Sequence, residues 1–489
     1  MSRLVIVSNR TPGKTPAAGG LAVALKGTLT EHEGFWFGWS GKLVENPSKQ
    51  ARFETIDGIR VGSVDLTRDD HQAYYAGFSN SILWPAFHLR LDLATIQTPW
   101  YEGYRHVNAQ FAEALKPQLR PDDIIWVHDY HLIPFAAMLR ERGAHNRIGF
   151  YLHIPFPTSD ALYAIPHHEE LMRDLSAYDL IGLQAQRDVA AFTEFADHLA
   201  PTTLMTGHAE PADFSTTEIA AFPIGSDPDA FAQLAVSPTA TKMRHRMQRS
   251  LGDQALILGV DRLDYSKGLP QRVEAYEKLL AHNTGLRRRV HLLQIAPPSR
   301  DSIKEYQAIG AELDAMCGRV MGNFAEPDWQ PLTYVKRAYG QPTLAGLYRQ
   351  ARIGLVTPLR DGMNLVAHEY VGAQNPNDPG VLVLSRFAGA AEIFPDAIQV
   401  NPFDTDETAE ALRLALIMPL DERRQRWEAL SAAAHRYSIS NWAESFLEAL
   451  SIPDRAPSSA TTKKGRRATP ADIATTARNI LRIGQQASN

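Results

Sequence analysis

Short apolar runs, each followed by polar or glycine residues, alternate along the chain with longer stretches that suit helices. Continuous apolar runs of this kind are typical of strands buried on both faces of a parallel sheet. Their alternation with helices predicts an α/β fold with helices on both faces of the sheet. The expected strands are Leu4–Ser8, Ile124–His128, Ile148–His153, Leu180–Leu183, Ala255–Val260, Val290–Ile295, Ile353–Thr357 and Val381–Leu384. The expected helices are Val107–Leu119, Asp188–Leu199, Gln271–Leu280 and Ser302–Met316.

The predicted strands fall into two groups, separated near residues 225–254. Pro223-Ile224-Gly225 ends a strand there, and the polar, basic stretch Ser237–Ser250 precedes the next strand. Two doubly wound domains of roughly 200 residues therefore fit the 489-residue chain better than three smaller ones. We expect an N-terminal domain over residues 1–235 and a C-terminal domain over residues 236–452, whose last helix packs back on the N-terminal domain.

Residues 453–489 are predicted to form a flexible basic tail. Pro453–Pro470 is rich in serine, threonine, alanine and proline and contains Lys463-Lys464-Gly465-Arg466-Arg467, a composition typical of disordered linkers. A charge run of this kind is usually solvated, although it also suits contact with an anion or a partner. Ala471–Ile483 suits a short helix after the linker.

The composition excludes several classes of protein. Fifty basic residues against 55 acidic ones leave a net charge of −5, which disfavours a dedicated nucleic-acid binder. The single cysteine, Cys317, excludes an internal disulfide and a cysteine-based zinc site. The apolar run at the start is too short for a signal peptide, and no stretch approaches the roughly 18 apolar residues of a membrane span. We therefore expect a cytoplasmic protein that contacts neither nucleic acid nor membrane.

Charged and polar residues follow the carboxyl ends of the predicted strands in both halves. In an open parallel sheet, residues at these ends line the ligand crevice. This pattern therefore predicts a ligand site on each half. The segments are Ser8-Asn9-Arg10, His128-Asp129-Tyr130-His131, His153-Ile154-Pro155, Asp261–Gly268, Ala296–Arg300 and Pro358–Asn364.

In the second half, Arg262 and Lys267 lie five residues apart in a loop that contains glycine. Two fixed cations there suit a diphosphate, because they neutralise a developing negative charge. The alternative is a structural role, in which Arg262 pairs with Asp261 or Asp264 within the loop.

Asp361-Gly362-Met363-Asn364 precedes the expected helix Leu365–Ala373. Gly362 allows the backbone to approach a ligand closely, and the first N–H groups of a helix suit phosphate oxygens. Glu369 lies one turn into this helix, where its carboxylate would accept from sugar hydroxyls. The alternative for Glu369 is a solvated helix face.

The first half offers a different set of residues. Arg10 and Gly19-Gly20 flank a loop that we expect to order over an anion. Taken singly, Tyr75 and Trp84 are more often structural aromatic residues. His128-Asp129-Tyr130-His131 resembles a metal-ligand cluster, but a facial triad would need a third ligand that we cannot place, so Asp129 is better explained as an acceptor for sugar hydroxyls.

Taken together, these segments resemble the trehalose-6-phosphate synthase family, retaining glycosyltransferases with two Rossmann-like domains that face a cleft (the GT-B fold). The resemblance extends from about residue 2 to about residue 450 and excludes the tail. The motifs that carry it are Ser8-Asn9-Arg10, Ala18–Val23, Leu83-Trp84-Pro85-Ala86-Phe87-His88, His128-Asp129-Tyr130-His131, His153-Ile154-Pro155-Phe156-Pro157, Arg262–Pro270 and Thr357–Ala367.

The resemblance implies transfer of glucose from UDP-glucose to glucose 6-phosphate, which gives α,α-trehalose 6-phosphate and UDP with retention of configuration. It implies no cofactor and no metal, because arginine and lysine neutralise the diphosphate. It also implies a homo-oligomer, a tetramer or a dimer, with a role in the stress response.

By motif position, the resemblance implies that the acceptor phosphate is held by Arg10, Tyr75 and Arg300. The acceptor sugar is positioned by Trp84 and Asp129. The implied donor residues are Gly19, Arg262, Lys267, Tyr339, Asp361, Gly362, Met363, Asn364, Leu365, Val366, Ala367, His368 and Glu369. The implied catalytic residues are Asp129, His153, Arg262, Lys267 and Asp361.

The implied mechanism differs from that of a retaining glycosidase, which needs two carboxylates about 5 Å apart. The strand ends offer cations and scattered acids instead of such a pair. The resemblance therefore implies front-face attack through an oxocarbenium-like transition state. In this mechanism the leaving phosphate oxygen takes the acceptor's proton, while Arg262 and Lys267 stabilise the departing UDP.

Two alternatives stay open. One is a related transferase that uses another nucleotide base or a cyclitol, against which the Gly19-Gly20 loop and the phosphate-binding set argue. The other is a catalytically silent subunit that binds a sugar phosphate and regulates a partner. Silent subunits typically lose their donor-site residues, whereas Arg262, Lys267, Asp361 and Glu369 are all present here.

Overall fold

A computed structural model describes residues 2–13, 20–206, 212–300 and 303–451 of the chain. Gly19 and the predicted tail over residues 453–489, with its expected helix Ala471–Ile483, lie outside the described residues. Within the described ranges, no helix combines the length and the apolar character that crossing a membrane requires.

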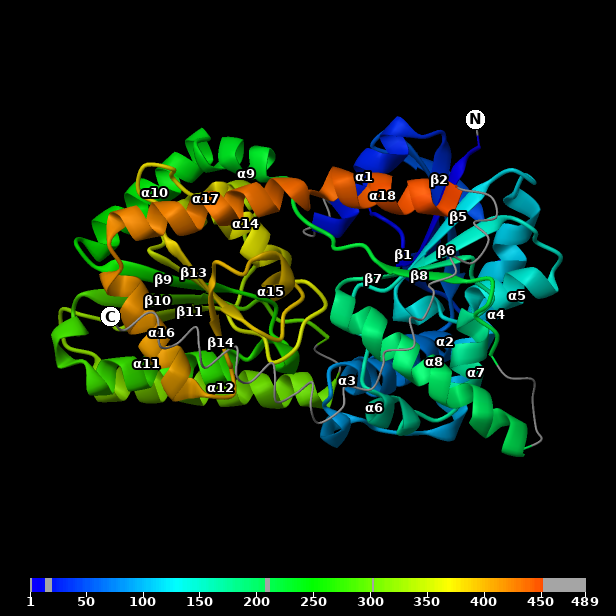
Figure 1. Cartoon of the computed structure of the whole chain (residues 1–489), viewed down its shortest axis with the longest axis horizontal. Coiled ribbons are helices and arrows are strands. Elements are labelled where there is room, and N and C mark those ends of the chain that lie inside the picture. Colours follow the sequence, from blue (N-terminus) through cyan, green and yellow to red (C-terminus); the bar gives the residue numbers. More distant parts are fainter. Residues whose placement is uncertain (1, 14–19, 207–211, 301–302, 452–489) are drawn as a thin grey trace, which may run out of the picture. The chain divides into compact units, whose positions relative to one another are not determined.

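The first half of the chain forms an eight-stranded sheet in the order β3-β4-β2-β1-β5-β6-β7-β8 (Figure 1). All neighbouring strands run parallel except β3 and β4, which are antiparallel. The strands are β1 (Leu4–Arg10), β2 (Gly34–Leu43), β3 (Arg52–Ile56), β4 (Ile59–Leu66), β5 (Ile124–His128), β6 (Arg147–Tyr151), β7 (Leu180–Leu183) and β8 (Glu218–Ala221).

The second half forms a six-stranded sheet in the order β11-β10-β9-β12-β13-β14, in which every pair is parallel. The central strands are buried along their whole length, as the continuous apolar runs predict. The strands are β9 (Ala255–Val260), β10 (Val290–Ile295), β11 (Leu332–Val335), β12 (Ile353–Val356), β13 (Val381–Ser385) and β14 (Ile398–Val400).

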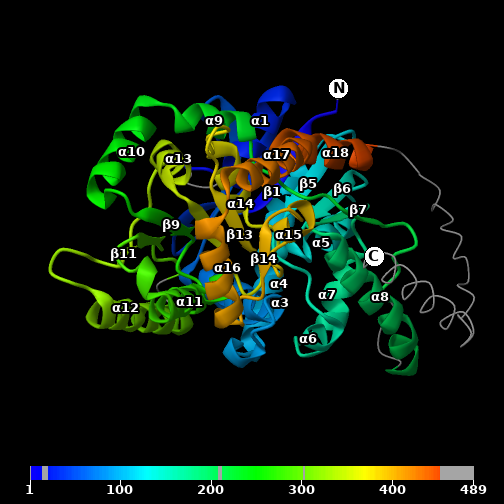
Figure 2. The ribbon, with the colours of Figure 1, turned by 60° about the vertical axis from the view of Figure 1, so that its left-hand side comes forward.

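Helices and single turns connect the strands in both halves. In the second half, α10 and α13 lie side by side (Figure 2). The first half contains α1 (Gly20–Glu31), α2 (Arg68–Asp70), η1 (His71–Leu83), α3 (Trp84–Phe87), η2 (Leu91–Leu93), α4 (Thr98–Leu115), η3 (Lys116–Gln118), η4 (Tyr130–Leu132), α5 (Phe135–Glu141), α6 (Ser159–Tyr163), α7 (His168–Leu175) and α8 (Gln186–Thr206). Helix α9 (Pro228–Ala235) precedes the boundary expected after residue 235 but packs on helices of the second half. The remainder are α10 (Pro238–Leu251), η5 (Tyr265–Lys267), α11 (Leu269–His282), η6 (Thr284–Leu286), α12 (Lys304–Phe324), α13 (Gln341–Gln350), α14 (Leu365–Ala373), α15 (Ala390–Ile393), α16 (Thr405–Ile417), α17 (Leu420–Arg436) and α18 (Ile439–Ser451).

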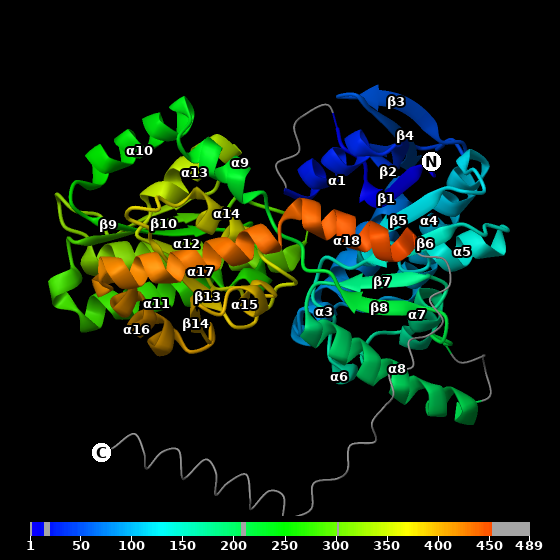
Figure 3. The same ribbon diagram turned by 45° about the horizontal axis from the view of Figure 1, so that its top comes forward.

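The α/β class with two parallel-sheet halves is confirmed, and each expected strand is present with small shifts at its ends. The strand expected to end near Pro223-Ile224-Gly225 is β8, which ends two residues earlier at Ala221. The sequence analysis missed β2, β3, β4, β11 and β14, and the first sheet departs from the expected parallel arrangement at β3 and β4 (Figure 3). These two strands form a hairpin whose turn is Asp57-Gly58, both with positive φ (48° and 84°). Asp-Gly is a strong two-residue hairpin signal, so this element was available in the sequence.

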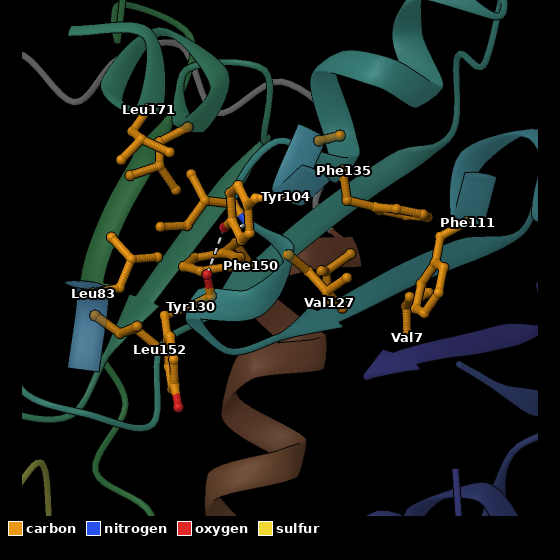
Figure 4. Packing of buried hydrophobic residues seen from close by; sticks show 14 of the residues in the cluster. Val7, Leu83, Tyr104, Phe111, Val127, Tyr130, Phe135, Phe150, Leu152 and Leu171 are labelled. Atoms are coloured by element: carbon orange, nitrogen blue, oxygen red, sulfur yellow. Dashed lines mark hydrogen bonds between the residues drawn. The ribbon is translucent and has the colours of Figure 1, made fainter. Parts of the chain in front are cut away.

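One hydrophobic cluster fills the first half around α4 (Figure 4). Val7, Val127 and Phe150, from β1, β5 and β6, belong to this cluster together with Tyr104 and Phe111 of α4. The buried hydroxyl of Tyr104 donates to the carbonyl of Tyr130 at 2.6 Å. This bond connects α4 to the turn that follows β5, which contains the candidate site residue Asp129.

Helix α18, the last one within residues 303–451, packs against β6 and β7 of the first sheet although it follows the second sheet in the sequence. A Cβ on Gly149 or Gly182 would lie 2.8 or 2.7 Å from the ring of Phe446, so these glycines leave room for that ring. Phe446 also stacks on Trp126, with ring centroids 4.7 Å apart. Burial of one phenylalanine side chain contributes about 1.5–3 kcal/mol, which holds α18 on the first half.

Candidate active site

Arg300, which follows β10 in the second half, reaches aromatic residues of the first half. Its guanidinium lies 3.8 Å from the ring centroid of Trp84, a cation–π contact. It also donates to the hydroxyl of Tyr130 at 3.2 Å and faces Asp264 at 3.4 Å. Burial lowers the pKa of Arg300, but Tyr130, Tyr306 and Asp264 outweigh it and raise that pKa. Arg300 is thus a permanent cation, with its side chain 9% exposed, where the two halves meet.

Tyr75 and Arg10 lie on neighbouring aromatic residues. Tyr75 stacks on His71 and His131, with ring centroids 5.1 and 5.7 Å away. The Arg10 guanidinium lies 5.6 Å from the ring of Trp39, which is 6.4 Å from the ring of Tyr75. The aromatic rings therefore place an exposed arginine close to a half-buried tyrosine.

A chain of hydrogen bonds connects Tyr75 to Arg300. The Asn80 amide donates to the Tyr75 carbonyl at 2.8 Å, and the Tyr130 hydroxyl donates to Asn80 Oδ1 at 2.9 Å. Arg300 completes the chain through Tyr130. The structure therefore brings two of the three residues predicted to bind the acceptor phosphate into one network.

Asp129 follows β5 with a φ of 79°, a strained conformation for a residue other than glycine. Its carboxylate accepts from the His153 N–H at 3.3 Å. Burial raises the pKa of Asp129 to about 6. Hydrogen bonds from the N–H groups of Tyr130 and His153 oppose this rise, and so do the positive charges of Arg300 and Arg262. Asp129 is therefore mainly ionised at neutral pH and lies among cations.

His153 follows β6 and lies beside His128. Nδ1 of His128 and Nε2 of His153 are 3.0 Å apart, so one ring donates to the other. Burial lowers the pKa of His153 to about 3, which keeps the ring neutral. Its carbonyl faces Gly362 of the second half, where an added Cβ would lie 2.3 Å from the oxygen. A glycine is therefore required at this approach of the two halves.

Lys267 and Asp361 form the centre of the second half's site. Lys267 Nζ donates to Asp361 Oδ2 at 2.5 Å, and the Asn364 amide donates to the same oxygen at 3.0 Å. The side chains of Lys267 and Asp361 are only 10% and 13% exposed, so solvent screens this ion pair weakly. A buried cation thus lies directly beside a carboxylate that can accept hydroxyl donors.

The alternative structural role of Arg262 is not seen. Asp261 pairs with Arg272 at 2.8 Å, and Asp264 faces Arg300. Arg262 is exposed instead, with its guanidinium 5.9 Å from the ring of Trp84. It is therefore available to a ligand between the halves.

The start of α14 is held by Asn364, whose φ is 83° and whose Oδ1 accepts from the Val366 N–H at 3.2 Å. Such a cap satisfies one of the free N–H groups at a helix start. Met363 and Ala367 are buried, so their side chains pack in the interior. Any contact they make with a ligand is through the backbone.

Glu369 and His368 face different surroundings. Glu369 is half-buried, accepts from the Tyr348 hydroxyl at 3.0 Å, and has its pKa raised to about 7 by burial. His368 is fully buried against Phe394, and burial lowers its pKa to about 3. Glu369 is therefore not on a fully solvated helix face, and His368 points into packed protein.

Glu369 lines a cavity of about 560 Å³ together with Leu365 of the same helix. Tyr339 lines a separate cavity of about 720 Å³, and its hydroxyl accepts from Arg337 at 2.9 Å. The structure does not bring these two predicted donor residues into one cavity. The first cavity is completed by residues of α1, α9 and α18, among them Gly27, Phe231, Ala443 and Leu447.

Several residues of the site were missed by the sequence analysis. Asp264 and Tyr130 lie in the strand-end segments that it selected, but their pairing with Arg300 joins residues far apart in the sequence. Trp39 and His71 lie outside the strand-end segments, so no sequence pattern indicated them. Within the described ranges, no group of three or more histidine, cysteine or acidic residues is placed to hold a metal ion. The absence of a metal requirement stays a prediction.

Two parallel-sheet halves, each with charged side chains at its carboxyl strand ends, define a glycosyltransferase of the GT-B type. A family model, glycosyltransferase family 20, matches residues 7–452. The chain belongs to this family.

Named relatives agree in length and sequence. The chain is 45% identical to the trehalose-6-phosphate synthase of Sodalis glossinidius over 460 residues, which cover 93% of this chain and 97% of the relative. The enzyme of that name from Sinorhizobium fredii is 46% identical, with coverage of 92% and 98%.

Solved structures agree in fold. The α,α-trehalose-phosphate synthase (UDP-forming) of Burkholderia xenovorans, in complex with glucose-6-phosphate, is similar with a TM-score of 0.86 and 48% identity, covering 92% of this chain and 100% of that one. The E. coli protein bound with UDP-2-fluoro glucose has a TM-score of 0.86 and 43% identity, with coverage of 93% and 100%.

Proposed function

We propose that the protein transfers glucose from UDP-glucose to glucose 6-phosphate, forming α,α-trehalose 6-phosphate and UDP with retention of configuration. The observation that carries this proposal is the meeting of the two strand-end sites. Arg300 lies on Trp84, and the Asp361–Met363 loop abuts His153. The relatives above, solved with glucose-6-phosphate or a UDP-glucose analogue, support the two substrates.

In this proposal the second half binds the donor. Lys267 and the exposed Arg262 neutralise the diphosphate, because fixed cations stabilise the charge that develops on a leaving phosphate. Asp361 accepts hydrogen bonds from hydroxyls of the transferred glucose, and the backbone from Gly362 to Leu365 holds the same sugar. Glu369 accepts from the ribose, while Tyr339 contacts the base through its backbone.

The acceptor binds on the first half, and Arg300 of the second half reaches across to it. Arg300, Arg10 and Tyr75 hold its phosphate, since guanidinium groups form paired, charge-assisted bonds with phosphate oxygens. Trp84 and Asp129 position the sugar. The Gly19 loop lies between the two substrates.

Catalysis proceeds by attack on the same face that the UDP leaves. His153 is neutral, so it does not act as a general acid. It faces the reacting centre through its backbone carbonyl and its ring. The proton of the attacking hydroxyl passes to the departing phosphate oxygen. Arg262 and Lys267 stabilise that oxygen as the bond to glucose breaks.

The proposal extends to the organisation of the chain. Residues 1–235 form the acceptor domain and residues 236–452 the donor domain, with α18 on the acceptor domain. The protein works without cofactor or metal, as a homo-oligomer in the cytoplasm, and binds neither nucleic acid nor membrane.

A direct assay tests this function. Purified protein is mixed with glucose 6-phosphate and with UDP-, GDP- or ADP-glucose without added metal, and nucleotide release and the anomeric couplings of the product are measured. Acceptor-dependent UDP release with an α,α-linked product is expected. Release from another donor alone would support the related transferase, and binding of glucose 6-phosphate without any release would support the silent subunit.

The titration of Glu369 predicts a pH dependence of donor use. Its carboxylate accepts hydrogen bonds from the ribose hydroxyls more strongly when it is ionised, so the KM for UDP-glucose is expected to fall up to about tenfold from pH 6 to pH 8, through the pKa of about 7. The Glu369→Gln variant should show a higher KM without this dependence. An unchanged pH profile in the variant would contradict the assignment.

The same shift predicts a stability effect. Because folded Glu369 binds its proton more tightly than an ordinary glutamate with a pKa of 4.5, the free energy of unfolding falls as the pH rises from 4.5 to about 7. Thermal unfolding of the wild type and of Glu369→Gln at both ends of this range measures the difference. The variant is expected to gain stability relative to wild type at the higher pH.

A further inference from the structure

A carboxylate of the second half caps a helix of the first half. Helix α8 begins at Gln186, directly after the loop that follows β7. The N–H groups of Gln186 and Arg187 donate to the two carboxylate oxygens of Glu392 on α15, at 3.0 and 3.4 Å. The first N–H groups of a helix have no partner within it, and a negative charge there is stabilising. Here that charge comes from about 200 residues further along the chain.

The side chain of Arg187 continues this contact. Its guanidinium donates to the carbonyls of Arg386 and Phe387, at 3.0 and 3.2 Å, and lies 3.9 Å from Glu392. We call these interactions of Gln186 and Arg187 with Arg386, Phe387 and Glu392 the α8–α15 contact. The side chains of Arg187 and Glu392 are about one-third exposed, at 33% and 36%.

On the second half, the α8–α15 contact is rigidly joined to the proposed donor site. The Phe387 carbonyl that accepts from Arg187 also accepts from the N–H of Asp361, at 3.2 Å. Ala390, the first residue of α15, donates its N–H to the Met363 carbonyl at 3.0 Å. A shift of α15 would therefore move the Asp361–Met363 loop.

On the first half, the contact is joined to His153. Gln184, two residues before α8, donates to the His153 carbonyl at 3.4 Å. Asp188, in the first turn of α8, accepts from the Phe156 N–H at 3.2 Å, and the Phe156 carbonyl accepts from Arg360 of the second half at 2.7 Å. The start of α8 thus fixes the loop that faces Gly362.

We propose that Glu392 and Arg187 are positioning residues, which hold the two halves in the register that places the Asp361–Met363 loop against His153. Neither residue is among those assigned to a substrate. Removing the contact shifts the population towards a more open arrangement, in which the second half still binds the donor nucleotide but the reacting groups are apart. This inference rests on the proposed function.

The variants Glu392→Ala and Arg187→Ala test this role by separating turnover from binding. Each is expected to lower kcat for UDP release about tenfold, while the Kd of UDP, measured by calorimetry, stays within about twofold of wild type. Glu392→Gln keeps an oxygen that accepts an N–H but loses the charge, so it should recover part of the rate. The fold-decrease in kcat of the double variant should be smaller than the product of the two single decreases, since both substitutions remove the same contact.

Hydrogen exchange measures the contact without substrate. The amides at the start of α8 should exchange faster in Glu392→Ala than in wild type, because they lose their acceptor. Glu410→Ala is the matched control, since Glu410 pairs with Arg413 on α16 within the second half. It should change neither exchange at α8 nor kcat.

The outcomes separate the two proposals. Wild-type turnover together with unchanged kcat and exchange in Glu392→Ala would overturn the positioning role and leave the proposed function intact. A loss of kcat that Glu410→Ala matches, or that comes with an equal loss of UDP affinity, would also overturn it. An inactive wild type would count against the proposed function, and the exchange experiment would then decide the contact by itself.

Discussion

Lys267→Ala is expected to reduce kcat for glucosyl transfer by about 10²- to 10³-fold, the effect of removing one fixed charge donor from a developing oxyanion. Lys267 is buried and lies 2.5 Å from Asp361, so no mobile side chain or bulk water replaces its charge. Steady-state UDP release at saturating substrates measures the loss. Unchanged turnover would remove Lys267 from the mechanism.

Folding must be separated from chemistry in this variant, because Asp361 loses its partner. Calorimetric binding of glucose 6-phosphate and a cooperative thermal transition would show that the first half and the fold persist. Lys278→Ala is the matched control, since Lys278 is a surface lysine of the same half that pairs with Asp406. Exposed ion pairs contribute little, so it should behave as wild type.

Arg300→Ala is expected to raise the KM for glucose 6-phosphate by about 10²-fold, which corresponds to the loss of a charge-assisted contact with phosphate. Trp84, Tyr130 and Asp264 fix the guanidinium in place, so little ordering is needed when phosphate binds. Arg300→Lys should recover only part of the affinity, because an ammonium lacks the planar fork.

The comparison with unphosphorylated glucose makes this test specific. Wild type and Arg300→Ala should use glucose about equally poorly, since the missing interaction is with the phosphate. Arg319→Ala, which breaks a surface pair with Glu277, serves as the control. An equal loss with both acceptors would indicate that Arg300 supports the fold and does not bind phosphate.

The segments that carry the site could be predicted from the sequence because the signals are local. An apolar run such as Ala255–Val260 can be buried on both faces only as a central strand, and the residues after it must then lie at the ligand edge of the sheet. The same reasoning placed Asp361 and the start of α14. The Asp57-Gly58 turn was equally local, but the hairpin was missed because neither strand has a continuous apolar run and β3 is largely exposed.

Partner choice, in contrast, depends on distance in space. The sequence left Arg262 with two neighbouring carboxylates as candidate partners, and both are occupied by other arginines, Arg272 and Arg300. Arg272 lies one helix further on, and Arg300 lies after the next strand. Packing of the second half brings them in, and this leaves Arg262 exposed.

The sequence by itself determined the α/β class, the two groups of strands and the segments at their ligand edges. The reason is that apolar runs and the polar residues that follow them are local patterns in the sequence. The tertiary structure decided which charges pair and which side of α14 faces a cavity. It also decided that Glu392 caps α8. These contacts join residues tens to hundreds of positions apart, and their free energy depends on close packing and on the exclusion of water, which no local pattern encodes.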